Sequence, residues 1–196
     1  MSEILSDDLR VGERRVEPVA ASGNPDHVQE LVDLSTAGVG GAETLFRTLA
    51  RNPGLFRRYL GFSGKLFSGK MPQRERELVI LRTAALCHSE YEWGQHVRIG
   101  REAGLTDADL ARVAAGAQAA GWSADEASVL RAVDQFVEHR AVDDETWTAL
   151  SETRDDARMI ELMFLIGHYV MLAGVIGTLR IEPEPGSAVL PSSLAP

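Results

Sequence analysis

Residues 74–104, RERELVILRTAALCHSEYEWGQHVRIGREAG, place an acidic residue inside an apolar helical pattern and then a Glu–His pair on a second helix. Glu77 is followed by apolar residues three, four and seven positions later, which is the spacing of one helix face. Ser89 is a helix-start signal, and Glu92 and His96 follow it one helical turn apart. The stretch predicts two helices with a short break between them, and both helices carry candidate residues for chemistry.

The composition and charge of the whole chain narrow the class of protein. Its 196 residues are 44% hydrophobic and 25% charged, which is enough for one globular domain with an apolar core. The formal net charge is −9, whereas non-specific binding of nucleic acid needs an excess of Lys and Arg. We therefore expect no nucleic-acid partner.

The compartment is predicted from the cysteine count and the N-terminal residues. The single cysteine, Cys87, excludes an intramolecular disulfide and fits a reducing compartment. The first ten residues, MSEILSDDLR, are polar and acidic and do not match a signal peptide. The apolar run 162–179 has the length of a minimal membrane span, but a helix at the centre of a helical core reads the same way. Because His168 lies inside this run, we interpret it as core and predict a cytoplasmic protein without a membrane partner.

The remaining pattern predicts an all-α fold, because no run alternates apolar and polar residues for long enough to form a strand. We expect an N-terminal arm over residues 1–23, a helical domain over 24–181 and a proline-rich tail over 182–196. An internal repeat of a helical unit is also indicated. RERELVIL at 74–81 and RMIELMFL at 158–165 share an Arg, a Glu three residues later and an apolar run.

The two carboxylates have both a structural and a chemical interpretation. Glu77 on an apolar face should be partly desolvated, which would raise its pKa, or it could form an ion pair with Arg74. Glu92 completes an S-x-x-E capping box with Ser89, in which each side chain bonds the other residue's amide. Two carboxylates in different environments also suit general acid–base work.

His96 is the third candidate, because a carboxylate one turn away can orient an imidazole that titrates near neutral pH. A histidine on such a face is also often a satisfied core residue. A metal site would need His88, Glu92 and His96 to share one unbroken helix, and the predicted cap at Ser89 breaks it. We favour Glu77, Glu92 and His96 as acid–base residues and expect no metal.

The stretch resembles the carboxymuconolactone decarboxylase family, within the alkylhydroperoxidase (AhpD-like) fold. The motifs that carry the resemblance are R-x-R-E-L-V-I-L-R and S-E-Y-E-W-x-x-H-x-x-x-x-x-x-A-G-L. It is sharp over 72–106 and looser over 24–181. The resemblance implies an all-helical protein that assembles as a homo-oligomer, a trimer or hexamer, with sites near subunit contacts.

In the peroxide-reducing members of this family, the motif is Glu, eleven residues, C-x-x-C, three residues, His. Here Ser89 and Glu92 occupy the two cysteine positions, and Cys87 falls two residues too early. Thiol–disulfide cycling needs two sulfurs, so the dithiol peroxidase mechanism is unsupported. What remains resembles the cofactor-free decarboxylases, with Tyr91, Trp93 and Ser89 shaping the substrate pocket.

Three hypotheses for function follow. The first is a cofactor-independent enzyme acting on a small carboxylated or lactone-type molecule, with His96 as general acid or base, Glu92 orienting it and Glu77 as a second proton donor. The second is a peroxidase-like or redox-sensing protein that uses Cys87 with an external thiol. The third is a non-catalytic helical oligomer in which these residues form interface bonds.

Overall fold

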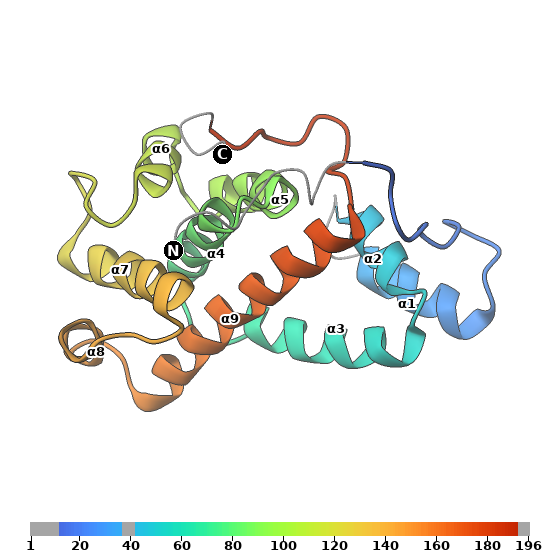
Figure 1. Ribbon diagram of the computed structural model, residues 1–196. Coiled ribbons are helices and arrows are strands. Elements are labelled where there is room, and N and C mark those ends of the chain that lie inside the picture. The colour runs from blue at the N-terminus through green and yellow to red at the C-terminus, as the bar shows by residue number, and fades with distance from the viewer. Residues whose placement is uncertain (1–11, 37–41, 192–196) are drawn as a thin grey trace. The chain divides into compact units, whose positions relative to one another are not determined.

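The computed structural model describes residues 12–36 and 42–191, and within them it contains helices and no strand (Figure 1). This confirms the predicted all-α class. In chain order the helices are α1 (Asp26–Thr36), α2 (Glu43–Leu49), α3 (Pro53–Phe67), α4 (Gln73–Leu86), α5 (Glu90–Glu102), α6 (Asp107–Ala115), α7 (Ala124–His139), α8 (Asp144–Ser151) and α9 (Asp156–Leu179). The ends of the predicted arm and tail, residues 1–11 and 192–196, lie outside the described residues.

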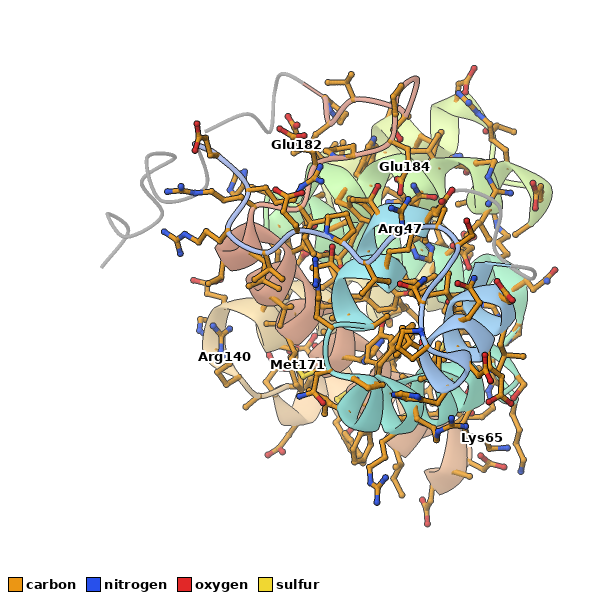
Figure 2. The ribbon with its side chains drawn as sticks, turned by 90° about the vertical axis from the view of Figure 1, so that its right-hand side faces the viewer. Arg47, Lys65, Arg140, Met171, Glu182 and Glu184 are labelled. Atoms are coloured by element: carbon orange, nitrogen blue, oxygen red, sulfur yellow. The ribbon has the colours of Figure 1, made fainter. Side chains whose placement is uncertain are left out.

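The chain divides into two compact units, and the first comprises Met1–Ser68 and Val175–Ser187. Its helices α1, α2 and α3 pack on one another, and the rings of Phe46 and Phe56 lie 6.0 Å apart. The segment before α1 is tied down, because Arg47 Nε donates to the Val19 carbonyl at 2.7 Å. The Thr44 amide of α2 donates to Glu184 Oε1, on the segment after α9, at 3.0 Å. Figure 2 labels Arg47 on α2 and Glu184 on that segment.

The second unit comprises Gly69–Gly174 and Ala188–Pro196, with α4 at its centre. α5, α6 and α7 all pack against α4, which is buried from Arg76 to Ala85. Because α4 carries apolar residues on all sides, neighbours must cover its whole circumference. The shared apolar core is formed by Leu78, Leu81, Ala84, Ala85, Trp93, Val97, Leu105, Leu110, Val113, Ala114, Ala117, Leu130 and Leu190.

The capping boxes show where local sequence decides a helix start and where it does not. Thr106 and Ser123 form complete boxes with Asp109 and Glu126, as the spacing predicts. The box predicted at Ser89 is wrong, since its side chain makes no capping bond. Thr106 and Ser123 have ψ angles of 166° and 159°, whereas Ser89 has ψ 89°, which aims its side chain away from the helix amides.

α9 is the long apolar helix of the chain. By length and composition it could cross a membrane, and half of its most apolar 18-residue window is buried. A core helix of a water-soluble domain meets the same criterion, so the criterion does not separate the two cases. Its residues up to 174 belong to the second unit, where Leu162, Leu165 and Ile166 are at most 1% exposed.

Candidate active site

A sharp break between α4 and α5 determines where the site residues lie. α4 ends at Leu86, and His88 adopts a left-handed backbone conformation with φ 50°. The Ser89 amide then donates to the Ala84 carbonyl at 2.9 Å, which closes the turn before α5 begins at Glu90. α5 packs against α4, so residues far apart on the two helices come into contact.

Glu77 of α4 and His96 of α5 meet inside the second unit. Glu77 has no exposed surface, and His96 is 6% exposed. His96 Nδ1 lies 2.7 Å from Glu77 Oε2. An ionised carboxylate can only accept hydrogen bonds, so we assign the proton of the neutral ring to Nδ1. Glu77 therefore orients the imidazole of His96 and selects its tautomer.

The charge of Glu77 is balanced by its neighbour in sequence. Arg76 Nε donates to Glu77 Oε1 at 3.1 Å, and the Arg76 side chain is itself 7% exposed. A buried carboxylate without a partner would be costly, and the guanidinium offsets that cost. Both oxygens of Glu77 thus have partners, the guanidinium of Arg76 on Oε1 and the imidazole of His96 on Oε2.

Tyr169 of α9 completes the arrangement on the other side of the imidazole. Its hydroxyl oxygen lies 3.0 Å from His96 Nε2, and the two rings meet edge to face with centroids 5.1 Å apart. With the ring proton on Nδ1, Nε2 accepts the hydrogen of the Tyr169 hydroxyl. Glu77, His96 and Tyr169 form a continuous buried chain of hydrogen bonds, which we call the relay.

His168 lies beside the relay. Its ring centroid is 5.3 Å from that of Tyr169, and the residue is 4% exposed. Burial, and to a smaller extent the nearby His96, lower the pKa of His168 to about 4. His168 is therefore neutral at neutral pH.

The other predicted site residues are buried on α5 or at its start. Glu92 is 2% exposed, Ser89 is 5% exposed, and Tyr91 and Trp93 are 3% exposed each. Trp93 packs in the apolar core of the second unit. The carboxylate on His96 Nδ1 belongs to Glu77, where the sequence had assigned the orienting role to Glu92. A substrate pocket formed by Tyr91, Trp93 and Ser89 stays a prediction.

The structure also locates the residues of the alternative metal site and the cysteine of the alternative thiol mechanism. His88 lies in the break between α4 and α5, so it does not share a helix with Glu92 and His96. Among residues 12–36 and 42–191, no three His, Cys, Asp or Glu side chains are grouped to hold a metal ion. Cys87 directly follows the last residue of α4, is half-buried and forms no disulfide.

A separate cleft of about 170 Å³ lies elsewhere on the second unit. It is lined by Pro72, Arg74, Glu75, Leu78, Asp125, Glu126 and Val129. None of these residues belongs to the relay. Its walls are largely ion-paired, because Arg74 Nε lies 3.0 Å from Glu126 Oε1 and Arg154 Nη2 lies 3.0 Å from Glu75 Oε2.

Sequence reasoning missed Arg76, Tyr169 and His168 as parts of this arrangement. Arg76 directly precedes Glu77, and only the fold reveals which neighbouring cation pairs with it. Tyr169 and His168 are polar groups inside the apolar run 162–179, which was the available signal. A buried tyrosine or histidine normally needs a hydrogen-bond partner, so each pointed to a polar site in the core.

The comparisons with known proteins agree with this fold. The model of the carboxymuconolactone decarboxylase family matches residues 53–135, which span α3 to most of α7 and include Glu77, Glu92 and His96. The resemblance deduced from the sequence motifs is thereby confirmed. No functionally curated protein matches the sequence significantly.

Several solved structures share the fold at low sequence identity. An uncharacterised peroxidase-related protein from Ralstonia eutropha JMP134, described as an alkylhydroperoxidase AhpD core, has a TM-score of 0.76 and 18% identity over 88% of this chain and 93% of its own. A peroxidase-related protein from Silicibacter sp. TM1040 has a TM-score of 0.77 and 14% identity over 89% and 93%. A debrominase in complex with 2,3,4-tribromopyrrole has a TM-score of 0.72 and 14% identity over 87% and 91%. At these identities the likeness shows the fold alone.

Proposed function

We propose that this member of the carboxymuconolactone decarboxylase family is a cofactor-independent acid–base enzyme that acts on a small carboxylated or lactone-type molecule. The observation that carries the proposal is the relay, in which Glu77 Oε2, His96 Nδ1, His96 Nε2 and the Tyr169 hydroxyl follow one another at 2.7 and 3.0 Å. A carboxylate, an imidazole and a hydroxyl in that order form a general path for a proton. The substrate class rests on the family match.

The relay divides the proton-transfer work among its members. Tyr169 is its terminal group and takes a proton from the substrate while passing its own hydrogen to His96 Nε2. The ring becomes an imidazolium, which the Glu77 carboxylate stabilises across the 2.7 Å contact. In the return step, His96 Nε2 gives a proton back to the Tyr169 oxygen, and the Tyr169 hydroxyl delivers a proton to the substrate carbon.

This chemistry suits decarboxylation and isomerisation alike. When CO₂ leaves a β-carbonyl acid, the electron pair remains on the substrate as an enolate, and one proton must then reach carbon. Isomerisation of a lactone removes a proton from one carbon and returns it at another. Both reactions need a positioned acid–base group in a site that excludes water, and the relay is buried.

The test is a solvent-isotope screen that does not require knowledge of the reaction. The purified chain is incubated in D₂O with a panel of small carboxylated lactones and β-keto acids, and deuterium at substrate or product carbon is followed by NMR. Glu77→Gln keeps the shape of the side chain but removes the charge that stabilises the imidazolium, so its rate should fall about 100-fold. Glu102→Gln on α5 is the matched control, because Glu102 is exposed and its ion pair with Arg98 lies on the surface of α5.

Two results would count against the proposal. One is that no compound of either class is labelled or consumed above the rate in buffer. The other is that Glu77→Gln and Glu102→Gln turn over a substrate equally fast. A cytoplasmic location and assembly as a trimer or hexamer stay predictions beside this one.

A second candidate function is peroxide reduction, favoured by the peroxidase-related proteins of the same fold. Cys87 would attack the peroxide as a thiolate, and the resulting sulfenic acid would need an external thiol for its reduction. Cys87→Ser would abolish peroxide consumption under this function, whereas the labelling rate of the acid–base enzyme would not change. The same pair of assays on wild type and Cys87→Ser therefore separates the two candidates.

A further inference from the structure

The segment 51–68, which contains α3, is basic in an otherwise acidic chain. It holds none of the 29 Asp and Glu residues and four of the 20 Lys and Arg residues, namely Arg51, Arg57, Arg58 and Lys65. The segment therefore carries +4 and the remaining residues −13, which together give the net charge of −9. A charge distribution this uneven turns one side of a protein toward an anionic partner.

Two parallel rows of side chains lie on the exposed side of α3. Leu55 and Phe62 are seven residues apart, so they form one row, and they are 63% and 41% exposed. Arg58 and Lys65 follow them by three residues each and form a second row about 60° around the helix. Both cations are exposed, and Figure 2 labels Lys65. We call Leu55, Arg58, Phe62 and Lys65 the α3 surface.

The other sides of α3 face the core or an acidic neighbour. Phe56 and Leu66 on the inner side are 1% and 7% exposed, so this side of the helix cannot turn outward. Of the three cations of α3, Arg57 alone has an ion-pair partner among the described residues, Glu30 of α1 at 3.7 Å. Arg57 lies about 160° around the helix from Leu55, so this carboxylate is on the far side from the apolar row. The α3 surface therefore presents cations without an ion-pair partner beside exposed apolar groups.

We propose that the α3 surface binds the surface of an anionic phospholipid bilayer, with α3 parallel to the membrane plane. In this orientation Arg58 and Lys65 contact headgroup phosphates, while Leu55 and Phe62 enter the boundary between headgroups and acyl chains. A basic row beside an apolar row is the pattern of a helix that lies in this boundary. No segment crosses the bilayer. Peripheral binding through α3 replaces the expectation of no membrane partner, which rested on the run 162–179.

The composition of the α3 surface favours a bilayer over a nucleic acid. Nucleic acids are contacted by cations on their phosphates and by polar side chains on their base edges. Leu55 offers neither kind of contact, and its exposed side chain gains free energy only by leaving water. A bilayer suits both rows at once, because its anionic headgroups lie directly above its apolar interior.

The binding should be reversible and sensitive to salt. Each Lys or Arg near an anionic leaflet strengthens binding about fivefold, so two such cations hold the protein at the membrane only in equilibrium with the free form. At a salt concentration of 1 M their electrostatic reach shrinks to about 3 Å. α3 belongs to the first unit and the relay to the second, so bilayer binding and the proposed chemistry can fail separately.

Vesicle flotation of the full chain tests the contribution of charge. At low salt, the wild type should float with vesicles of two parts phosphatidylcholine to one part phosphatidylserine, and it should not float with pure phosphatidylcholine. The double variant Arg58→Gln/Lys65→Gln should bind the anionic vesicles about 25-fold more weakly, and high salt should release the wild type. Arg98→Gln/Arg101→Gln is the matched control, because it removes the same charge from exposed side chains of α5 and should bind like wild type.

The same flotation assay tests the contribution of the apolar row. Leu55→Gln keeps every charge and removes the larger exposed apolar area of that row, so it should weaken binding to the anionic vesicles about 10-fold. Leu34→Gln on α1 is the matched control. Leu34 is 68% exposed, but α1 carries acidic residues and no Lys or Arg, so this leucine should not meet the membrane. Leu34→Gln should therefore bind like wild type.

Four outcomes would overturn the proposal. The first is a wild type that floats with neither kind of vesicle, and the second is equal binding to both kinds. The third is equal binding of anionic vesicles by the two double variants. The fourth is binding of a single-stranded oligonucleotide that Arg58→Gln/Lys65→Gln weakens and Leu55→Gln does not, because the α3 surface would then serve a nucleic acid. Circular dichroism confirms that each variant is folded before its binding is compared.

Discussion

Two glutamates of α4 stand two residues apart, and the fold gives only one of them an imidazole partner. Positions two apart on a helix point to different sides of it. Glu75 meets guanidinium groups, with Arg154 Nη2 at 3.0 Å and Arg158 Nη2 at 3.2 Å. Glu77 meets Arg76 at one oxygen and the imidazole of His96 at the other. The same residue type on one helix is thus placed in a charge cluster in one case and in the relay in the other.

The two sites differ in whether they contain a group that can change its protonation state near neutral pH. Arg154 has a side chain with no exposed surface, and it bonds both oxygens of Glu75 and both of Asp125. Its guanidinium also holds the pKa of Asp125 below the usual range. The pKa of Arg154 is raised in turn by its hydrogen bonds to Asp125 and Glu75, so Asp125 and Arg154 keep their charges at neutral pH. The relay instead passes from a carboxylate to an imidazole and a phenol, which can hand a proton along.

The largest effect that separates the two sites should come from His96→Asn. The asparagine amide can still donate to Glu77, but nothing replaces Nε2 as the acceptor of the Tyr169 proton. We expect the turnover rate to fall by about 1,000-fold or more, which corresponds to roughly 4 kcal/mol in the barrier. Steady-state kinetics on any substrate found in the D₂O screen measures this. His139→Asn, at an exposed histidine of α7, should keep the wild-type rate.

Arg154→Met should affect stability and leave the chemistry alone. It removes the cation that Glu75 and Asp125 share, and breaking a buried pair in this way costs about 3 kcal/mol of unfolding free energy. Urea unfolding gives the loss, and the rate per folded molecule should match the wild type. Arg98→Met, from an exposed pair with Glu102, should cost no more than about 0.5 kcal/mol. A slower enzyme with unchanged stability would mean that the charge cluster belongs to the site.

Tyr169→Phe tests the far end of the relay. The change removes the hydroxyl that lies 3.0 Å from His96 Nε2 and keeps the edge-to-face ring contact. The rate should fall about 100-fold, roughly 2.7 kcal/mol in the barrier, because the substrate loses its proton carrier. Tyr59→Phe on α3 serves as the control for removing a tyrosine hydroxyl. Equal turnover rates for Tyr169→Phe and wild type would show that the Tyr169 hydroxyl takes no part in proton transfer.

The smallest effect concerns His168 and appears as a pH dependence of stability. Its pKa is about 4 in the folded chain and near 6.5 when unfolded, so between these values the unfolded state binds more protons. Stability is therefore fully present above about pH 6.5 and declines as the pH falls toward 4. At pH 5 this term should cost about 2 kcal/mol relative to pH 7. Urea titrations at pH 7 and pH 5 should show a correspondingly smaller loss of unfolding free energy for His168→Asn than for wild type. His139→Asn should behave like wild type.

Much of the fold could be predicted from local sequence because its signals are local. Asn52 before Pro53 accepts from the Leu55 amide, and α3 begins where that pair predicts. Thr106 and Ser123 also start their helices as their spacing predicts. Ser89 has the same pattern and fails, since the left-handed turn at His88 sets its backbone first. A capping side chain therefore starts a helix only where the preceding residues let the N-cap residue adopt the required ψ angle.

The site could be predicted only in part, because its bonds join residues that are distant in sequence. Glu77 and His96 were identified as candidates by position, but their direct bond spans 19 residues and a turn. Tyr169 lies 73 residues from His96, inside a run whose apolar character points to core. The helical spacing of a sequence shows which residues share a helix face, but it does not show which buried polar groups of two helices form a hydrogen bond. The partner of a buried imidazole is a property of tertiary packing.

The protonation of His96 is the measurement that tests the central claim most directly. Nitrogen-15 NMR of the imidazole at pH 7.5 distinguishes the two neutral tautomers and the cation. The relay predicts a neutral ring with its hydrogen on Nδ1 and a bare Nε2 whose shift changes in Tyr169→Phe. A ring that carries hydrogens on both nitrogens at this pH, and does not respond to Tyr169→Phe, would be a fixed ion pair with Glu77. That result would contradict the account, and the relay would then be a structural contact like the cluster around Arg154.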